Sequence, residues 1–278
     1  MELEQNREAL ARRGFGIAAI SYDTVATLKH FASRRNIRYP LLSDTESRVI
    51  RAFGIFNESV PEGNMARGVP HPGLFVVDAK GIVTARYFED DYRERFTVAA
   101  ILRQHFGETS GTVAFRGETE HLKVTATLSA DSAAVGQRVG VELSIEMKPG
   151  MHVYAPGAPE DYIPLKWDVA ESQAWKAHPA EFPQPERLRL AGEVVPVFQK
   201  QFRIRRDVTV GPDARNVTAA APSGDLTISS SLRYQACDET KCFPPQTISM
   251  QWKLRVSSMD RERAPGESRR PQPAGERK

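Results

Sequence analysis

Two cysteines are the residues of this chain whose type and spacing most directly allow chemistry. Cys237 and Cys242 are the only cysteines among 278 residues, and four residues separate them in YQACDETKCFPPQ, residues 234–246. So close a pair fits three uses: a structural disulfide, part of a metal site, or a redox pair that alternates between dithiol and disulfide. The rest of the sequence has to distinguish between these uses.

The histidines do not complete a metal site. Zinc takes about four Cys or His ligands, usually in two closely spaced pairs. The histidines are spread along the chain without such a spacing, at His30, His71, His105, His121, His152 and His178. We therefore expect no metal, and no cofactor other than a disulfide between Cys237 and Cys242.

A structural disulfide would form easily here but would stabilise the fold only a little. A short loop can bring two Cα atoms within the roughly 4.4–6.8 Å that a disulfide spans. Closing so few residues removes little entropy from the unfolded chain, which suits a pair that switches between two states. The spacing alone leaves the structural and the redox interpretations both open.

The composition is that of a soluble protein with two domains. A chain of 278 residues usually exceeds what a single core supports. The net charge is only +3, with both signs interspersed, so we expect no nucleic-acid partner. No apolar run is long enough to span a membrane. The first residues lack the apolar core of a signal peptide, so the chain as written is expected to be unexported.

Residues 1–107 alternate between helix and strand patterns. Strands are predicted at 16–23 and 39–44, and GLFVVDAKGIVTARYF (73–88) predicts two strands around a turn. Helices are predicted at 2–13, after Thr24, after Asp44 and at 97–107, with Thr24, Asp44 and Asp78 as capping and turn residues. This order predicts an α/β domain with a mixed sheet.

The second half has a different pattern. Residues 108–120 are polar and contain glycine, which is typical of a linker. Short stretches with period-two alternation then follow between 121 and 257, and frequent prolines leave no room for long helices. This pattern predicts an all-β, immunoglobulin-like sandwich. Residues 258–278 have almost no apolar side chains and are predicted to be disordered.

The first half resembles a known family. Its AISYD, YPLLSD and PGLFVVDAKG segments, in this order within 14–107, resemble the AhpC/TSA peroxiredoxin-type branch of the thioredoxin-like superfamily. The resemblance implies a nucleophilic cysteine just before the helix that opens this chain. The family's first strand and active-site loop have no counterpart here, so we expect an incomplete, N-terminally truncated domain. Without a cysteine of its own, this half is expected to have no peroxidase activity; a structural or interaction module is the alternative.

The same resemblance draws attention to Pro72. Thioredoxin-like folds place a cis-proline before the strand that faces the active site, and Pro72 precedes such a strand. The resemblance therefore implies a cis peptide bond at His71–Pro72. The alternative is an ordinary proline at the start of a strand.

The second half also resembles a known family. MHVYAPG, YIPLKWDV, PVFQKQFRI and above all YQACDETKCFPPQT are similar to the N-terminal, disulfide bond corrector domain of the thiol:disulfide interchange protein DsbD. The resemblance covers about 121–257 and implies a periplasmic immunoglobulin-like domain with one redox-active cysteine pair on a hairpin. The loop departs from the family, because we expect five residues between the cysteines there.

What this resemblance implies is a thiol–disulfide relay. Cys237 would form the mixed disulfide with a thioredoxin-like or other disulfide-exchange partner, and Cys242 would resolve it. Tyr234, Phe243 and Pro244 would pack the hairpin and shield the sulfurs, and a loop near 190–195 would cap the pair. If the N-terminus is truncated, the family also implies a periplasmic or other extracytoplasmic location.

A different class of function remains as the alternative. The sandwich would then be a binding or interaction module with an inert structural disulfide. Trp167, Trp175 and Tyr154 would be the candidates for contacts with a ligand or protein, although aromatic side chains such as these are more often part of a core.

Overall fold

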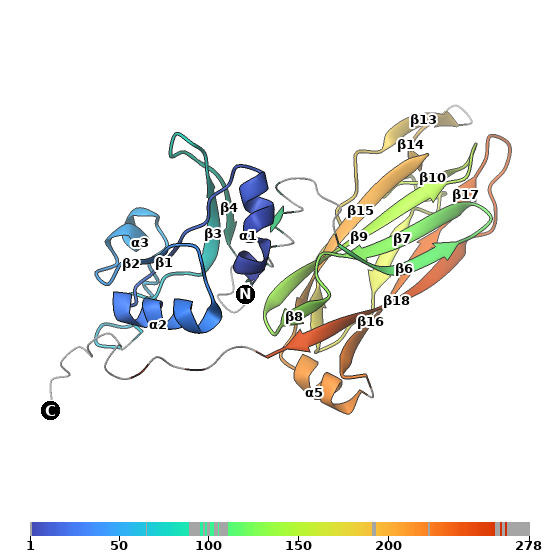
Figure 1. Ribbon diagram of the computed structural model, residues 1–278. Coiled ribbons are helices and arrows are strands. Elements are labelled where there is room, and N and C mark those ends of the chain that lie inside the picture. The colour runs from blue at the N-terminus through green and yellow to red at the C-terminus, as the bar shows by residue number, and fades with distance from the viewer. Residues whose placement is uncertain are drawn as a thin grey trace. The chain divides into compact units, whose positions relative to one another are not determined.

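The protein is described by a computed structural model, shown in Figure 1. The described residues are 2–64, 66–88, 95–96, 98, 101–102, 105, 111–190, 193–221, 223–258, 262 and 265. The chain divides near Val98 into two compact units, which we describe separately. No described helix is long and apolar enough to cross a membrane.

The N-terminal unit contains helices and short strands in alternation. In chain order they are α1 (Glu2–Arg12), β1 (Ala19–Ser21), α2 (Val25–Arg35), β2 (Leu41–Ser43), α3 (Arg48–Ala52), β3 (Gly73–Val77), β4 (Val83–Phe88) and β5 (Arg95–Phe96). β1 pairs in parallel with β2, and β3 pairs antiparallel with β4. No described strand joins the two pairs by hydrogen bonds, so they form two separate two-stranded sheets. The expected mixed sheet is therefore not formed.

Polar side chains fix the ends of these elements as the sequence predicts. The Thr24 side chain accepts a hydrogen bond from the Thr27 N–H and caps α2. The Asp44 carboxylate accepts the N–H groups of Arg48 and Ile50, both at 2.9 Å, and so joins the end of β2 to α3. Asp78 accepts two backbone N–H groups within the turn between β3 and β4, also at 2.9 Å.

The prediction of a cis peptide bond before Pro72 is wrong, because every peptide bond in the described residues is trans. Pro72 lies directly before β3, and the N–H of His71 donates to the carbonyl of Ile55 at 2.7 Å. The chain enters the strand here without a turn that would require the cis form. The trans form, which is favoured at X–Pro bonds by about 0.5–1 kcal/mol, is therefore retained.

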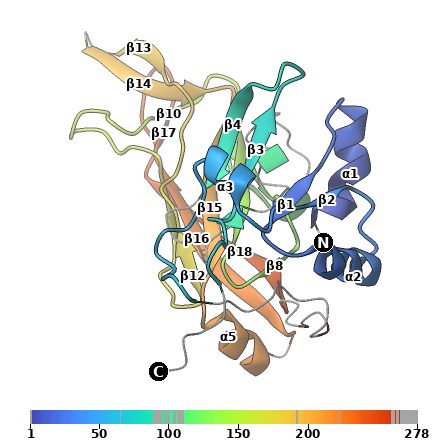
Figure 2. The same ribbon diagram turned by 90° about the vertical axis from the view of Figure 1, so that its left-hand side faces the viewer.

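The C-terminal unit is a β-sandwich. One sheet has the order β12-β15-β9-β7-β6, and the facing sheet has the order β11-β16-β18-β8. Their strands are β6 (Thr112–Glu118), β7 (Leu122–Leu128), β8 (Ser132–Ala134), β9 (Gln137–Met147), β11 (Lys166–Val169), β12 (Trp175–Ala177), β15 (Gln201–Val210), β16 (Asp225–Tyr234) and β18 (Gln246–Ser257). A short helix, α5 (Ala214–Ala220), lies at one end of the sandwich (Figures 1 and 2).

The inward-facing side chains of both sheets form one continuous core. Along β16 and β18 the buried residues alternate with less buried ones, as expected for strands with one face on a core. Trp167 of β11 and Trp252 of β18 meet edge to face with ring centroids 6.5 Å apart. The buried Trp167 indole donates to the Ser230 hydroxyl at 2.9 Å. The predicted immunoglobulin-like sandwich is confirmed.

The predicted linker at 108–120 is wrong for Thr112–Glu118, which form β6 and pair antiparallel with β7. The pairing is favourable because it satisfies the backbone edge of β7, and because Ala114 and Phe115 pack against the core. The predicted helix at 97–107 and the predicted disordered tail at 258–278 lie largely outside the described residues.

A disulfide at one end of the sandwich as the candidate functional site

A third, smaller sheet positions the cysteines. Its order is β13 (Glu186–Leu190), β14 (Glu193–Gln199), β10 (His152–Tyr154) and β17 (Ala236–Cys237), and its strands pair antiparallel. It lies at the end of the sandwich opposite α5 in both views (Figures 1 and 2). The chain leaves β16 at Tyr234 and enters β17 two residues later, so the first cysteine is carried from the sandwich directly into this sheet.

The two faces of this sheet have different neighbours. Val153, Phe198 and Ala236 belong to the core of the sandwich. On the opposite face, a second buried cluster consists of Tyr154, Val195, Val197 and Cys237, with Ala158, Tyr162 and Leu188 packed against it. This division follows from the period-two alternation of strands. Cys237 therefore lies in a small apolar cluster of its own, separate from the main core.

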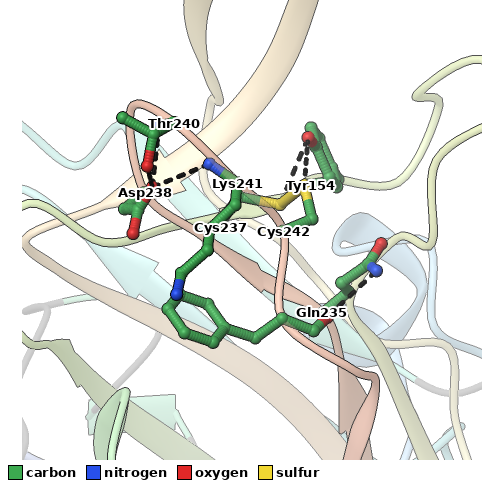
Figure 3. Close-up of a disulfide and its surroundings, with 8 residues drawn as sticks. Tyr154, Gln235, Cys237, Asp238, Thr240, Lys241 and Cys242 are labelled. Atoms are coloured by element: carbon green, nitrogen blue, oxygen red, sulfur yellow. Dashed lines mark hydrogen bonds between the residues drawn. A yellow bond between two sulfur atoms is a disulfide. The ribbon is translucent and has the colours of Figure 1, made fainter.

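Cys237 and Cys242 form a disulfide, with their Cα atoms 4.0 Å apart (Figure 3). The two residues also form a β-bridge, and the N–H of Phe243 donates to the carbonyl of Ala236 at 2.9 Å, which continues the hairpin pairing. Cys237 is 1% exposed, whereas Cys242 is exposed to solvent. Only Cys242 is therefore open to approach from solution.

Tyr154 is the polar group in contact with the disulfide. Its hydroxyl oxygen lies 3.3 Å from the Sγ atom of Cys242 and 3.3 Å from that of Cys237 (Figure 3). Disulfide sulfurs carry no hydrogen, so the phenol is the donor. Tyr154 is 2% exposed, and its burial, together with the neighbouring Tyr162, raises its pKa above the usual value. The hydroxyl therefore keeps its proton at neutral pH.

The contact between Tyr154 and the sulfurs cannot be predicted from the residue types alone. The sequence suggests this residue only as an aromatic contact in the binding-module alternative, and 83 residues separate it from Cys237. The register of β10 against β17 brings the two together, and this register is a property of the folded sheet. The MHVYAPG segment, which contains Tyr154, is similar to the DsbD family. That similarity does not by itself predict the contact between Tyr154 and the disulfide.

The Asp238 carboxylate closes the loop between the cysteines. Its Oδ1 atom accepts the Thr240 N–H and hydroxyl, both at 2.7 Å, and the Lys241 N–H at 2.8 Å (Figure 3). These hydrogen bonds, those from Thr240 first, hold the pKa of the Asp238 carboxyl below its usual value. The hairpin is thus shaped by backbone and side-chain hydrogen bonds in addition to the disulfide.

Tyr234, one of the residues expected to support the hairpin, lies at its base. The side chain is fully buried, and its hydroxyl donates to Gln246 Oε1 at 2.5 Å and lies 2.8 Å from the Thr119 hydroxyl. Tyr234, the last residue of β16, also pairs with Gln246, the first residue of β18. Tyr234 therefore fixes the point at which the hairpin leaves the sandwich.

Phe243 and Pro244 lie between Cys242 and the start of β18. The Phe243 ring packs on the His121 ring, with centroids 4.4 Å apart, and the Lys241 ammonium lies 4.9 Å from its centroid. Pro244 is exposed. Tyr154, Val195 and Val197 pack in one buried cluster with Cys237, and shielding of the sulfurs by Phe243 and Pro244 stays a prediction.

The loop expected to cap the cysteines, residues 190–195, belongs to the hairpin of β13 and β14. Val195 and Val197 of β14 are fully buried in the cluster around Cys237. Residues 191–192 lie outside the described residues. The described part of this hairpin covers Cys237 and leaves Cys242 exposed.

The other candidate groups are engaged elsewhere. Trp167 is part of the main core, and the Trp175 indole donates to the Ala170 carbonyl at 2.8 Å. Within the described ranges, no group of three or more His, Cys, Asp or Glu side chains could hold a metal ion.

The chain combines an immunoglobulin-like sandwich that carries a disulfide at one end with a thioredoxin-like unit, and each of the two parts matches a known family. Residues 119–252 match the family described as "Thiol:disulfide interchange protein DsbD, N-terminal". Residues 1–86 match the AhpC/TSA family. Both resemblances expected from the sequence are confirmed.

Individual relatives cover single parts of the chain. Peroxiredoxin Bcp of Escherichia coli strain K12 is 30% identical over 91 residues, which are 33% of this chain and 56% of that protein. The chain therefore spans only a little more than half the length of this relative. The N-terminal periplasmic domain of ScsB from Proteus mirabilis is 17% identical, with a TM-score of 0.40, and covers 52% of each chain. The reduced DsbD N-terminal domain of Neisseria meningitidis is 14% identical, with a TM-score of 0.31, covering 49% of this chain and 86% of that one.

The matched families and the bonded cysteine pair together support a thiol–disulfide redox function in general terms. The N-terminal unit contains no cysteine, because both cysteines of the chain lie in the hairpin. Thiol chemistry by this chain therefore depends on Cys237 and Cys242.

Proposed function

We propose that the Cys237–Cys242 pair exchanges its disulfide with a partner protein that carries a thioredoxin-like dithiol. The observation that carries this proposal is the unequal exposure of the two cysteine residues. Cys242 is open to solvent, whereas Cys237 is 1% exposed within an apolar cluster. A relay needs one sulfur that a partner can reach and one that is protected from unrelated thiols, and this pair has both.

The proposed reaction begins at Cys242. A partner thiolate attacks the Cys242 Sγ, the bond between Cys237 and Cys242 breaks, and its electron pair stays on the Cys237 sulfur. A second partner thiol then attacks the partner's own sulfur in the mixed disulfide and releases Cys242 as a thiolate. The partner dithiol is oxidised to a disulfide and this pair is reduced to a dithiol. The reverse sequence passes electrons to the partner.

This order of events replaces the one expected from the family resemblance, in which Cys237 formed the mixed disulfide. Burial of Cys237 makes it the leaving sulfur. The Tyr154 hydroxyl, already 3.3 Å from Cys237 Sγ, is placed to donate to the thiolate as it forms. Hydrogen bonds to a charged acceptor are stronger than those to a neutral one, so this contact is tighter in the reduced state than in the disulfide.

The proposed setting is an oxidising, extracytoplasmic compartment. Disulfides form and persist in such compartments and are rare where glutathione and thioredoxin keep thiols reduced. A disulfide with one exposed cysteine, here Cys242, is accessible to the thiols of a reducing compartment.

Trapping of the mixed disulfide tests the proposal. Cys237→Ser leaves the exposed Cys242, and Cys242→Ser leaves the buried Cys237. Each variant is activated with an aromatic disulfide reagent and mixed with a purified thioredoxin whose second active-site cysteine is replaced by serine. Non-reducing mass spectrometry then measures the rate of covalent complex formation.

We expect Cys237→Ser to form the complex at least about tenfold faster, since thiol exchange depends on access to the sulfur attacked. Equal or faster reaction of Cys242→Ser would contradict Cys242 as the point of attack. Failure of both variants to form a complex would contradict the exchange function and favour the alternative, a binding protein with an inert disulfide.

A further inference from the structure

His152 is a buried residue next to Cys237 that has no role in the proposed reaction. In the antiparallel pairing of β10 with β17, His152 lies directly opposite Cys237. Side chains of directly opposed residues project from the same face, with Cβ atoms about 4.5–5.5 Å apart. Tyr154, two residues further along β10, shares this face, and its ring meets the His152 ring edge-on with centroids 5.7 Å apart.

The His152 ring has an unused hydrogen-bonding group. The side chain is 4% exposed, and within the described part of the chain its Nε2 atom is buried without a hydrogen-bond partner. A buried polar atom without a partner is costly, at about 1–3 kcal/mol. The disulfide offers Nε2 no hydrogen-bond donor, because its sulfurs carry no hydrogen. After reduction, Cys237 can form a hydrogen bond with Nε2, as a donor when it is a thiol and as an acceptor when it is a thiolate.

The groups around His152 favour a neutral ring. Asp238, which follows Cys237, attracts a proton to the imidazole, but burial has the larger effect and lowers the His152 pKa below its usual value. On its other side, His152 lies opposite Gln199 of β14, whose amide donates to Glu186 of β13 at 2.7 Å. Tyr154 is protonated at neutral pH. In a neutral imidazole Nε2 is a donor or an acceptor according to the tautomer, and in either form it can bind the Cys237 sulfur.

We propose that His152 is a positioning residue that hydrogen-bonds the Cys237 sulfur only in the dithiol state, and so biases the pair toward reduction. This inference rests on the proposed redox function of the same cysteines. When the disulfide breaks, the Cys237 sulfur receives its electron pair and finds two polar groups on one strand, the Tyr154 hydroxyl and the His152 imidazole. The imidazole gains a partner that it lacks in the disulfide state.

The equilibrium with glutathione tests this proposal without any protein partner. Two glutathione thiols reduce the pair to the dithiol and leave as glutathione disulfide, so atoms and electrons balance. His152→Phe keeps a ring but removes both nitrogens. We expect its equilibrium constant for reduction to fall about three- to tenfold, as for the loss of one hydrogen bond. A tenfold fall corresponds to a potential about 30 mV more negative.

Two amide variants provide a second test in case His152→Phe does not fold. His152→Gln extends an amide to about the position of Nε2, and we expect it to retain the wild-type equilibrium within about twofold. The shorter His152→Asn does not reach this position and should behave like the phenylalanine variant. His121→Phe is the matched control, because His121 is equally buried, at 5% exposed, but packs on Phe243; its equilibrium should not change.

A purely structural role for His152 would lower the thermal stability of both redox states equally and leave the glutathione equilibrium unchanged; that result would overturn the inference. Equal shifts for His152→Gln and His152→Asn would also overturn it. Failure of the exchange function is seen separately, as loss of complex formation with thioredoxin while the glutathione equilibrium remains measurable.

Discussion

Removal of one oxygen atom, by Tyr154→Phe, tests how the buried sulfur is released. The Tyr154 hydroxyl lies 3.3 Å from both sulfurs and is the polar contact that the structure places against them. Phenylalanine keeps the ring that packs on Tyr162, with centroids 4.5 Å apart, and the contacts with the valines of β14. The substitution therefore removes the hydrogen bond and leaves the apolar cluster in place.

The size of the effect follows from the change in charge at Cys237. A hydrogen bond to a charged group contributes about 1.5–3 kcal/mol, against about 0.5–1.5 kcal/mol for a neutral one. The Tyr154 hydrogen bond therefore stabilises the Cys237 thiolate by about 1–2 kcal/mol more than it stabilises the disulfide. Because each 1.4 kcal/mol corresponds to about tenfold in rate, and the charge is only partly developed in the transition state, we expect reduction to slow by about three- to tenfold.

Stopped-flow measurement of reduction by dithiothreitol at neutral pH provides the assay. Tyr234→Phe is the matched control, because the Tyr234 hydroxyl binds Gln246 and Thr119 rather than the sulfurs. We expect it to lower the thermal midpoint while changing the rate less than about twofold. Equal rates for Tyr154→Phe and the wild-type protein, with both folded, would refute the role of the hydroxyl.

Two further predictions concern the fold and the hairpin. Trp167→Ala should reduce the free energy of unfolding by about 3–5 kcal/mol, as large core truncations do, which urea unfolding of the oxidised protein would measure; a loss below about 1 kcal/mol would contradict its place in the core. The pKa of the Asp238 carboxyl is lower in the folded state than the value of 3.8 for the unfolded chain. The ionised carboxylate therefore stabilises the fold fully at pH values above 3.8, and this stabilisation is lost as the pH falls through the folded-state pKa. Asp238→Asn should therefore weaken the acid dependence of the thermal midpoint below about pH 4, and an unchanged acid dependence would contradict this role.

Much of the architecture follows from local patterns in the sequence. Thr24, Asp44 and Asp78 occupy cap and turn positions because their side-chain oxygens satisfy nearby backbone N–H groups, a preference that is visible in the residue types themselves. The alternation along β16 and β18 likewise records which face is buried. Such signals need only a few neighbouring residues, which is why the sandwich could be predicted.

Features that depend on distant pairing were not predictable in this way. Residues 112–118 look like a linker by composition, and they become β6 only because the edge of β7 is available for pairing. The two separate small sheets of the N-terminal unit depend on which strands find partners. Similarly, the conformation of Pro72 depends on how the chain enters β3, and residue types near it do not determine that.

The site was predictable in its chemistry but not in its surroundings. The motif identified Cys237 and Cys242 as the redox candidates. It did not show that Cys237 is buried and Cys242 exposed, since this difference arises from the packing of Val195 and Val197 of β14 against Cys237. Tyr154 and His152 reach the cysteines only through the register of β10, far from them in the sequence.

The reduction potential of the Cys237–Cys242 pair tests the central claim most directly. The intact protein would be equilibrated with buffers of reduced and oxidised dithiol, and the fraction of free thiol measured by alkylation and mass spectrometry. Structural disulfides have potentials below about −300 mV, and exposed, exchanging ones have higher values. The proposed relay predicts a potential clearly above about −300 mV, whereas a value below it would show an inert structural disulfide.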